Sequence, residues 1–138
     1  FSDQFWVDRW KVKGTGSNFT SWDVEFQRSV TGIVYVSGNV YRGSGGQSFR
    51  QFTIPSSVLS WLLPMHYQFS AGVNKFKKFQ LGGVFIRESD DGIGRDTSGA
   101  FIYKNGSSYH LTLEFAGGHT AQINDQYPSI ANTIWNNA

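Results

Sequence analysis

The chain has 138 residues, no cysteine and a net charge of +2 at neutral pH. These values predict one domain spanning residues 1–138, and they exclude disulfides and thiolate metal sites. The small net charge does not indicate a nucleic-acid partner. No apolar run approaches the ~20 residues of a membrane span, so we expect no membrane insertion.

The composition favours strands over helices. Aromatic residues make up 17% of the chain and charged residues 16%, against about 25% charged in an average domain. Phe, Tyr, Trp, Val and Thr are typical of strands, and so many aromatic residues argue against disorder. Glycine-rich turn signals recur about every ten residues, as in a sandwich or barrel. The sequence therefore predicts an all-β fold, either an antiparallel β-barrel or a jelly-roll-like sandwich.

The clearest strand pattern begins at Trp22. Trp22, Val24 and Phe26 alternate with polar residues, and only a half-buried strand places them on one face. The apolar run 33–36 is typical of a strand covered on both sides, and the segment 57–63 is either a short helical turn or irregular. With 22–28 and 33–36 included, the expected strands in chain order are 4–12, 22–28, 33–36, 48–54, 67–73, 83–88, 99–104, 108–115 and 120–124.

Asn105-Gly106 predicts a tight hairpin. A two-residue type I′ turn at this dipeptide pairs Lys104 with Ser107 and Ile102 with Tyr109. The core face of the hairpin then carries Ala100, Ile102, Tyr109, Leu111, Leu113 and Phe115. The opposite face is mixed, with Phe101, Tyr103, Ser108, His110, Thr112 and Glu114. A mixed face must lie under another layer, meet another subunit or contact a ligand.

We expect no catalytic activity, no cofactor and no metal. The sequence contains no nucleophile elbow, Walker loop or His-Glu-x-x-His motif. His66, His110 and His119 do not have metal-ligand spacing. Carboxylates for a glycosidase pair are available, but the sequence does not place them in space. A small hydrolase therefore stays open as an alternative.

The segment Lys75-Phe76-Lys77-Lys78-Phe79 interleaves basic and aromatic residues. This combination can bind single-stranded nucleic acid through phosphate contacts and stacking. We favour an edge strand, in which the lysines block aggregation while the rings pack inward. No nucleic-acid partner is therefore expected.

The aromatic residues outnumber what one small core requires. Surplus rings can stack on the C–H faces of sugars while neighbouring polar groups bind the hydroxyls, or they can pack between identical subunits. The loop from Glu88 to Asp96 supplies such polar groups. The candidate carbohydrate-binding residues are Asp90, Asp91 and Arg95 in this loop, Tyr103 and His110 on the mixed hairpin face, and His119.

The order of segments along residues 20–115 resembles a known family. A strand, a short basic turn and a second strand occupy 23–40, and a Ser/Gly-rich loop follows. Phe52-Thr53-Ile54-Pro55, Leu63-Pro64-Met65-His66-Tyr67, Gly83-Val84-Phe85-Ile86 and the Asn-Gly hairpin then succeed one another. This order is similar to the C-terminal head domains of receptor-binding proteins of tailed phages, notably baseplate tip proteins of phages that infect lactic-acid bacteria.

The resemblance implies a compact β-barrel or jelly-roll head on an extracellular tail tip or baseplate of a virion. Three copies would pack about a threefold axis and bind host cell-wall polysaccharide near the subunit boundaries, without cofactors. Because the chain begins at Phe1, we expect it to be a processed piece that joins other baseplate or tail proteins through a missing N-terminal region. A monomeric carbohydrate-binding module of a secreted enzyme or baseplate protein, and a structural virion domain, are the alternatives.

Overall fold

The computed structural model describes residues 6–43, 48–65, 75–76, 80–81, 84–86, 99–105, 107–115 and 119–131. They form an all-β fold with one short helix, which confirms the all-β part of the predicted fold class. The elements are β1 (Trp6–Gly16), β2 (Thr20–Ser29), β3 (Ile33–Arg42), β4 (Ser48–Thr53), α1 (Ser56–Leu62), β5 (Lys75–Phe76), β6 (Gln80–Leu81), β7 (Val84–Ile86), β8 (Gly99–Asn105), β9 (Ser108–Phe115) and β10 (His119–Pro128).

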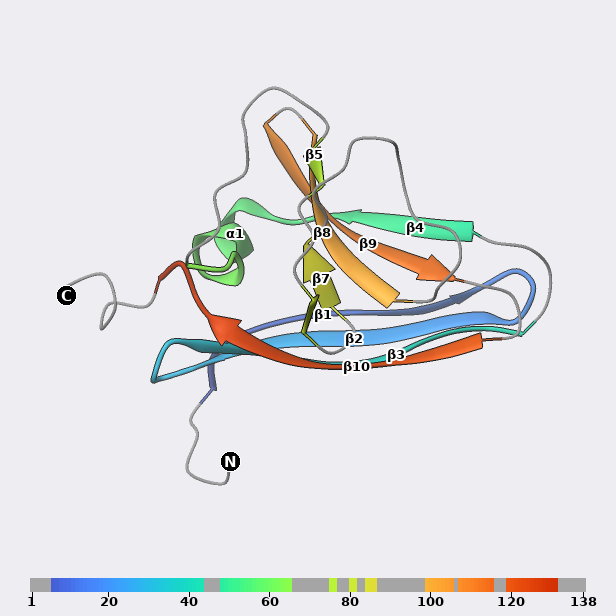
Figure 1. Cartoon of the computed structure of the whole chain (residues 1–138), viewed down its shortest axis with the longest axis horizontal. Helices are drawn as coiled ribbons and strands as arrows, with labels where there is room; N and C mark the ends of the chain where they lie inside the picture. The colour runs from blue at the N-terminus through green and yellow to red at the C-terminus, as the bar shows by residue number, and fades with distance from the viewer. Residues whose placement is uncertain are drawn as a thin grey trace.

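The strands form two sheets that lie one above the other, with α1 at one end (Figure 1). The first sheet has the order β1-β2-β3-β10 and is antiparallel throughout. The second has the order β4-β9-β8-β7-β6, with β5 pairing β8 and with β7 and β8 parallel. A barrel needs its two edge strands to pair with each other. Among the described strands neither sheet closes in this way, so the expected closed barrel is not found.

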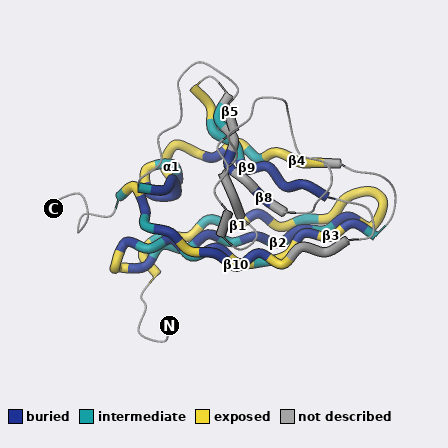
Figure 2. Tube along the Cα trace, viewed as in Figure 1, coloured by how far each residue is buried: buried dark blue, intermediate teal, exposed yellow. Residues whose placement is uncertain are grey.

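The core lies between the two sheets, where the alternating strands turn their apolar faces toward each other (Figure 2). Trp22 of the first sheet packs against Phe52 and Phe115 of the second, with ring centroids 6.1 and 5.9 Å apart. The Arg50 guanidinium lies 4.6 Å from the centroid of the same indole, within cation–π distance. Trp22, Val24 and Phe26 are all buried, as their spacing predicts.

Helix α1 settles the ambiguous segment 57–63 as helical. Its buried residues Val58, Trp61 and Leu62 follow the i, i+3, i+4 spacing of one helical face. Two hydrogen bonds join its C-terminal end to the end of β10. The Tyr127 hydroxyl donates to the Leu62 carbonyl at 2.6 Å, and the Ser129 hydroxyl donates to the Trp61 carbonyl at 2.5 Å.

The β8–β9 hairpin differs by two residues from the predicted register. Lys104 pairs with Tyr109 and Ile102 pairs with Leu111, so that residues 106–107 separate the strands. This register places Ile102 opposite Leu111 on the core face, and both side chains are fully buried. A two-residue shift preserves which side chains share a face. Of the predicted core residues, Ala100, Ile102, Leu111, Leu113 and Phe115 are accordingly buried, and Tyr109 is partly buried against the core.

The mixed face of this hairpin is covered near Thr112 and Glu114. Thr112 is fully buried and Glu114 is 1% exposed, so at these positions the mixed face lies under other parts of the chain.

The run 33–36 was predicted to be covered on both faces, but the structure covers only one of them. Its even residues are buried, but Ile33 and Tyr35 on the other face are only half-buried. The prediction that this strand is covered on both sides is therefore wrong. The expected strand 67–73 lies outside the described residues.

Candidate functional site

The residues predicted to bind carbohydrate fall in different parts of the fold. Tyr103 and His110 are direct partners across β8 and β9, and His110 Nδ1 lies 3.5 Å from the Thr53 hydroxyl. His119 begins β10 in the other sheet, opposite Arg42. The structure thus brings Tyr103 and His110 together and places His119 on a separate sheet. Asp90, Asp91 and Arg95 lie outside the described residues.

A broad polar surface lies on the first sheet, on the side turned away from the second sheet. We call it the outer face. Side chains alternate along each strand, so the buried residues identify the inner face and their neighbours form the outer one. Its central residues are Arg9, Lys11 and Lys13 of β1, Asp23, Glu25 and Gln27 of β2, Tyr35, Ser37, Asn39 and Tyr41 of β3, and Gln122, Asn124 and Gln126 of β10.

The charged groups of the outer face all belong to β1 and β2. Arg9 Nε lies 2.7 Å from Glu25 Oε2. Lys11 Nζ and Lys13 Nζ lie 3.5 and 4.0 Å from the two carboxylate oxygens of Asp23. Exposed ion pairs of this kind add little stability. They do place each of the three cations beside a carboxylate, with Lys11 and Lys13 sharing Asp23.

The other half of the outer face, on β3 and β10, is uncharged at every outer-face position that the structure describes. Asn39 pairs with Gln122, and Ser37 pairs with Asn124. We call the exposed residues Ser37, Asn39, Gln122, Asn124 and Gln126 the amide band. Asn is disfavoured in strands, so strand stability does not explain Asn39 and Asn124. Each carboxamide does offer a donor and an acceptor side by side.

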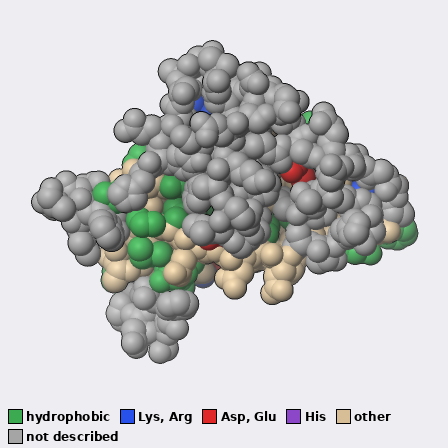
Figure 3. Space-filling model, viewed as in Figure 1, with side chains coloured by type: hydrophobic (Ala, Val, Ile, Leu, Met, Phe, Trp, Pro, Cys, Tyr) green, Lys and Arg blue, Asp and Glu red, His purple; other side chains and the backbone are tan. Residues whose placement is uncertain are grey.

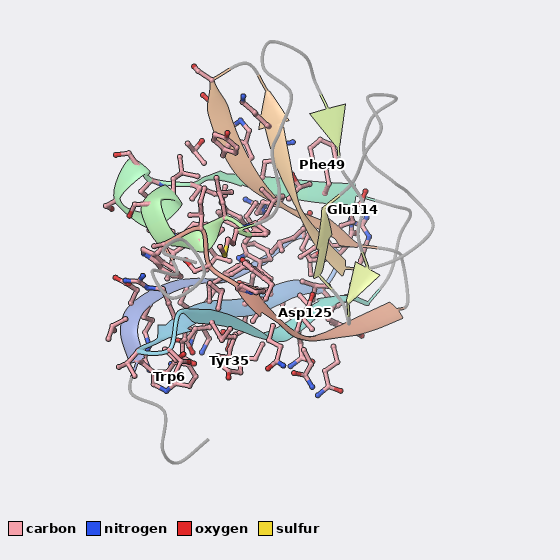
Figure 4. All side chains as sticks on the ribbon, turned by 60° about the vertical axis from the view of Figure 1, so that its left-hand side comes forward. Trp6, Tyr35, Phe49, Glu114 and Asp125 are labelled. Atoms are coloured by element: carbon pink, nitrogen blue, oxygen red, sulfur yellow. The ribbon has the colours of Figure 1, made fainter. Side chains whose placement is uncertain are left out.

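An aromatic pair borders one end of the amide band. Trp6 meets Tyr35 edge to face, with ring centroids 5.3 Å apart and planes at 77°, an arrangement that aromatic rings favour. The β1–β2 register shifts between Trp6 and Asp8. Without this bulge, Trp6 would share the inner face with Trp10 and Val12. The bulge re-aims its indole outward, and Figure 4 shows Trp6 and Tyr35 together on the outer face.

A second group of aromatic residues lies at the other end of β3. Phe19 is 78% exposed and Tyr41 39% exposed. A Cβ on Gly43 would lie 2.8 Å from Phe19 Cβ and 3.0 Å from the Tyr41 hydroxyl, so both side chains approach the bare glycine. Asn18 and Phe19 have φ values of 59° and 57°, as the two central residues of a type I′ turn do. The Thr20 amide closes this turn by donating to the Ser17 carbonyl at 3.2 Å.

This arrangement could not be located from local sequence alone. The aromatic surplus predicted exposed rings, but the outer face draws on four strands that only the sheet pairing brings together. A period-two signal was nevertheless present. Tyr35, Ser37, Asn39 and Tyr41 alternate along one strand, and three amides alternate along 122–126. A polar stripe of this kind predicts one solvated sheet face.

Asp125 lies on the inner face of β10 and is only 9% exposed (Figure 4). Its burial raises the pKa of the carboxyl to about 6, and a hydrogen bond from the Gln126 amide partly offsets this. The Gln126 amide donates to Asp125 Oδ1 at 2.7 Å. Oδ2 accepts no hydrogen bond from the part of the chain that is described. The carboxyl is thus enclosed away from the outer face.

In the described ranges, no cluster of His, Asp and Glu is close enough to hold a metal ion. The one helix found there, α1, is too short to cross a membrane. No protein-family model, curated protein or solved structure matches this chain. Its function must therefore be inferred from its own residues.

Proposed function

We propose that this chain is a non-enzymatic head domain of a phage receptor-binding protein that binds cell-wall polysaccharide of its bacterial host. It would be a jelly-roll-like sandwich, displayed as a trimer on the extracellular tail tip or baseplate of the virion. The main supporting observation is the outer face, where exposed aromatic rings border an uncharged band of amides. The loop candidates Asp90, Asp91 and Arg95 remain part of the proposal as a second contact region.

Saccharide chemistry fits these side chains. A pyranose ring has an apolar C–H face that packs on aromatic rings such as those of Trp6 and Tyr41, and its rim of hydroxyls both donates and accepts hydrogen bonds. The carboxylates of the outer face, Asp23 and Glu25, are each within ion-pair distance of a cation.

Trimeric display would strengthen weak individual sites, because linked sites raise the effective concentration of each other. Hydrophobic side chains gather near the end of the molecule where α1 lies above β10 (Figure 3). Val30 and Ile130 are exposed. Ile130 lies beside the end of α1, where its amide donates to the Leu63 carbonyl, and the turn that contains Val30 lies close by, since the Ser129 amide donates to the Gly32 carbonyl. These apolar groups suit a contact between copies of the chain.

The direct test is retention of the purified chain on cell walls of lactic-acid bacteria. We expect walls of a susceptible host to retain the chain, and wall polysaccharide released from them to compete. The chain should release no sugar from the walls. If no wall in a panel of host strains retains it, saccharide recognition is wrong; release of reducing sugar would instead support the hydrolase alternative.

A monomeric carbohydrate-binding module is the second candidate. One observation fits it: the outer face is continuous across four hydrogen-bonded strands, β1, β2, β3 and β10. Light scattering during size-exclusion chromatography separates the two candidates by mass. A trimer supports the phage head, and a monomer that still binds walls supports the module. A chain that binds no saccharide would leave a structural virion role.

A further inference from the structure

We infer that the saccharide is an uncharged glycan chain that lies along β3 and β10 over the amide band. The Trp6–Tyr35 pair would hold one end and Phe19 with Tyr41 the other. This inference rests on the proposed function and adds the site and the ligand class to it. Three features carry it: the separation of charge across the outer face, the spacing of its rings, and the composition of an edge strand.

The separation of charge selects the ligand class. A uronate or phosphate that lost water over the amide band would find no cation among the described outer-face residues of β3 and β10, and an unpaired charge is costly to desolvate. The cations of β1 already face Asp23 and Glu25. Neutral hydroxyls, in contrast, match the donors and acceptors of Asn39 and Asn124. The amide band therefore discriminates against anionic sugars.

The spacing of the aromatic rings sets the direction in which the glycan lies. Tyr35 and Tyr41 lie six residues apart on one strand, so about 20 Å separates them at ~3.3 Å per residue. Between them, Ser37 and Asn39 face Asn124 and Gln122 across the strand pair. An extended glycan parallel to β3 would meet a ring, two polar pairs and a second ring in succession. A glycan lying across the strands would meet the ion pairs instead.

The edge strand β10 has an unusual composition for its position. Edge strands commonly expose lysine, which prevents pairing with other chains. The exposed side chains described on β10 are Gln122, Asn124 and Gln126, and the charged Asp125 points inward. Amides at an edge protect poorly against aggregation but suit hydrogen bonding to sugars. Because these groups stand on paired strands, the backbone beneath them is already ordered before binding, which favours affinity.

The experiment divides host wall polysaccharide by anion exchange into a neutral fraction and a fraction that bears phosphate or uronate. Each fraction is titrated calorimetrically against the whole chain. We expect the neutral fraction to bind, with an affinity that changes less than about twofold between about 50 and 500 mM NaCl. Tyr35→Ala and Asn124→Ala should each weaken binding about tenfold, the usual effect of losing one stacking or hydrogen-bonding contact.

Asn124→Lys separates the two ligand classes. It should weaken binding of a neutral glycan and strengthen binding of an anionic one, and lysine is well tolerated at a sheet edge. Lys11→Ala, on the charged half of the same face, is the matched control and should bind as the unmodified chain does. Arg95→Ala tests the loop candidate in parallel. Equal urea midpoints for all variants would show that each of them folds.

The outcomes distinguish the two proposals. If neither fraction binds, the proposed function fails. If a fraction binds but Tyr35→Ala and Asn124→Ala bind it normally, saccharide recognition stands and the outer-face site is wrong. Loss of binding in Arg95→Ala alone would assign the site to the loop. Preference of the unmodified chain for the anionic fraction, or tighter binding of the neutral fraction by Asn124→Lys, overturns the uncharged ligand.

Discussion

The backbone of Gly38 lies so close to Asp23 that a Cβ at this glycine would fall 1.8 Å from the Asp23 carbonyl oxygen. Gly38 also has a φ of 138°, which residues other than glycine rarely adopt. It pairs with Val24 on one side and with Ile123 on the other. The centre of the first sheet therefore depends on a residue without a side chain.

Gly38→Ala should destabilise the fold by roughly 3 kcal/mol or more, because the obstructing atom is backbone and cannot move aside. Urea denaturation monitored by tryptophan fluorescence measures the loss. Gly16→Ala is the matched control. Its new Cβ would lie 3.4 Å from the Arg50 side chain, an ordinary contact, so its midpoint should hardly move. Equal midpoints for the two variants would contradict the close approach at Gly38.

The hydroxyl of Tyr127 joins strand β10 to helix α1 by donating one hydrogen bond to the Leu62 carbonyl. Tyr127→Phe removes the donor to the Leu62 carbonyl but keeps the ring, so we expect a loss of about 1–2 kcal/mol. Burial, followed by the charge of Asp125, raises the pKa of this phenol well above its usual value, and the donor therefore persists into alkaline solution. Tyr41→Phe, at an exposed hydroxyl, is the control. A Tyr127→Phe chain as stable as the unmodified one would show that the bond contributes nothing.

The β-bulge near Val7 gives a third prediction. Deleting Val7 removes the extra residue but leaves Trp6 opposite Ser29 and directly before Asp8, so the indole should stay on the outer face beside Tyr35. Wall-polysaccharide binding should therefore be retained in the deletion variant and fall about tenfold in Trp6→Ala. Calorimetric titration of both variants makes the comparison. If Trp6→Ala binds as tightly as the unmodified chain, Trp6 is not a contact.

Local patterns predicted most of the strands but few of their partners. Alternation at Trp22, Val24 and Phe26 needs only neighbouring residues, and it identified a buried strand face correctly. The hairpin register depended on which dipeptide occupies the turn. Asn105-Gly106 and Gly106-Ser107 both suit two-residue loops, and the core pairing of Ile102 with Leu111 decides between them.

The candidate site was harder to foresee because it is assembled from distant segments. Trp6 and Tyr35 meet only because a bulge reverses the Trp6 side chain and because the sheet order places β1 and β3 on either side of β2. Nothing in the residues near Trp6 marks that bulge. The segment 88–96, in contrast, can be selected as a candidate from the sequence because its polar residues are close together in the chain. Surfaces made of every second residue on several strands give no comparable local signal.

The buried carboxyl of Asp125 predicts an unusual pH dependence. Its pKa of about 6 in the folded chain exceeds the ordinary 3.8, so between these values the folded state holds a proton that the unfolded state releases. The favourable contribution of protonated Asp125 is thus fully present below about pH 4, declines as pH rises to about 6, and is absent above. At pH 8 the ionised group costs about 3 kcal/mol. Asp125→Asn should therefore stabilise the chain by up to that amount at about pH 8, and hardly at all at about pH 4. Urea denaturation of both proteins at the two pH values gives the difference directly, with all other titrating groups common to both. A difference of opposite sign, with the variant less stable at high pH, would mean that a cation pairs with Asp125 in the folded chain.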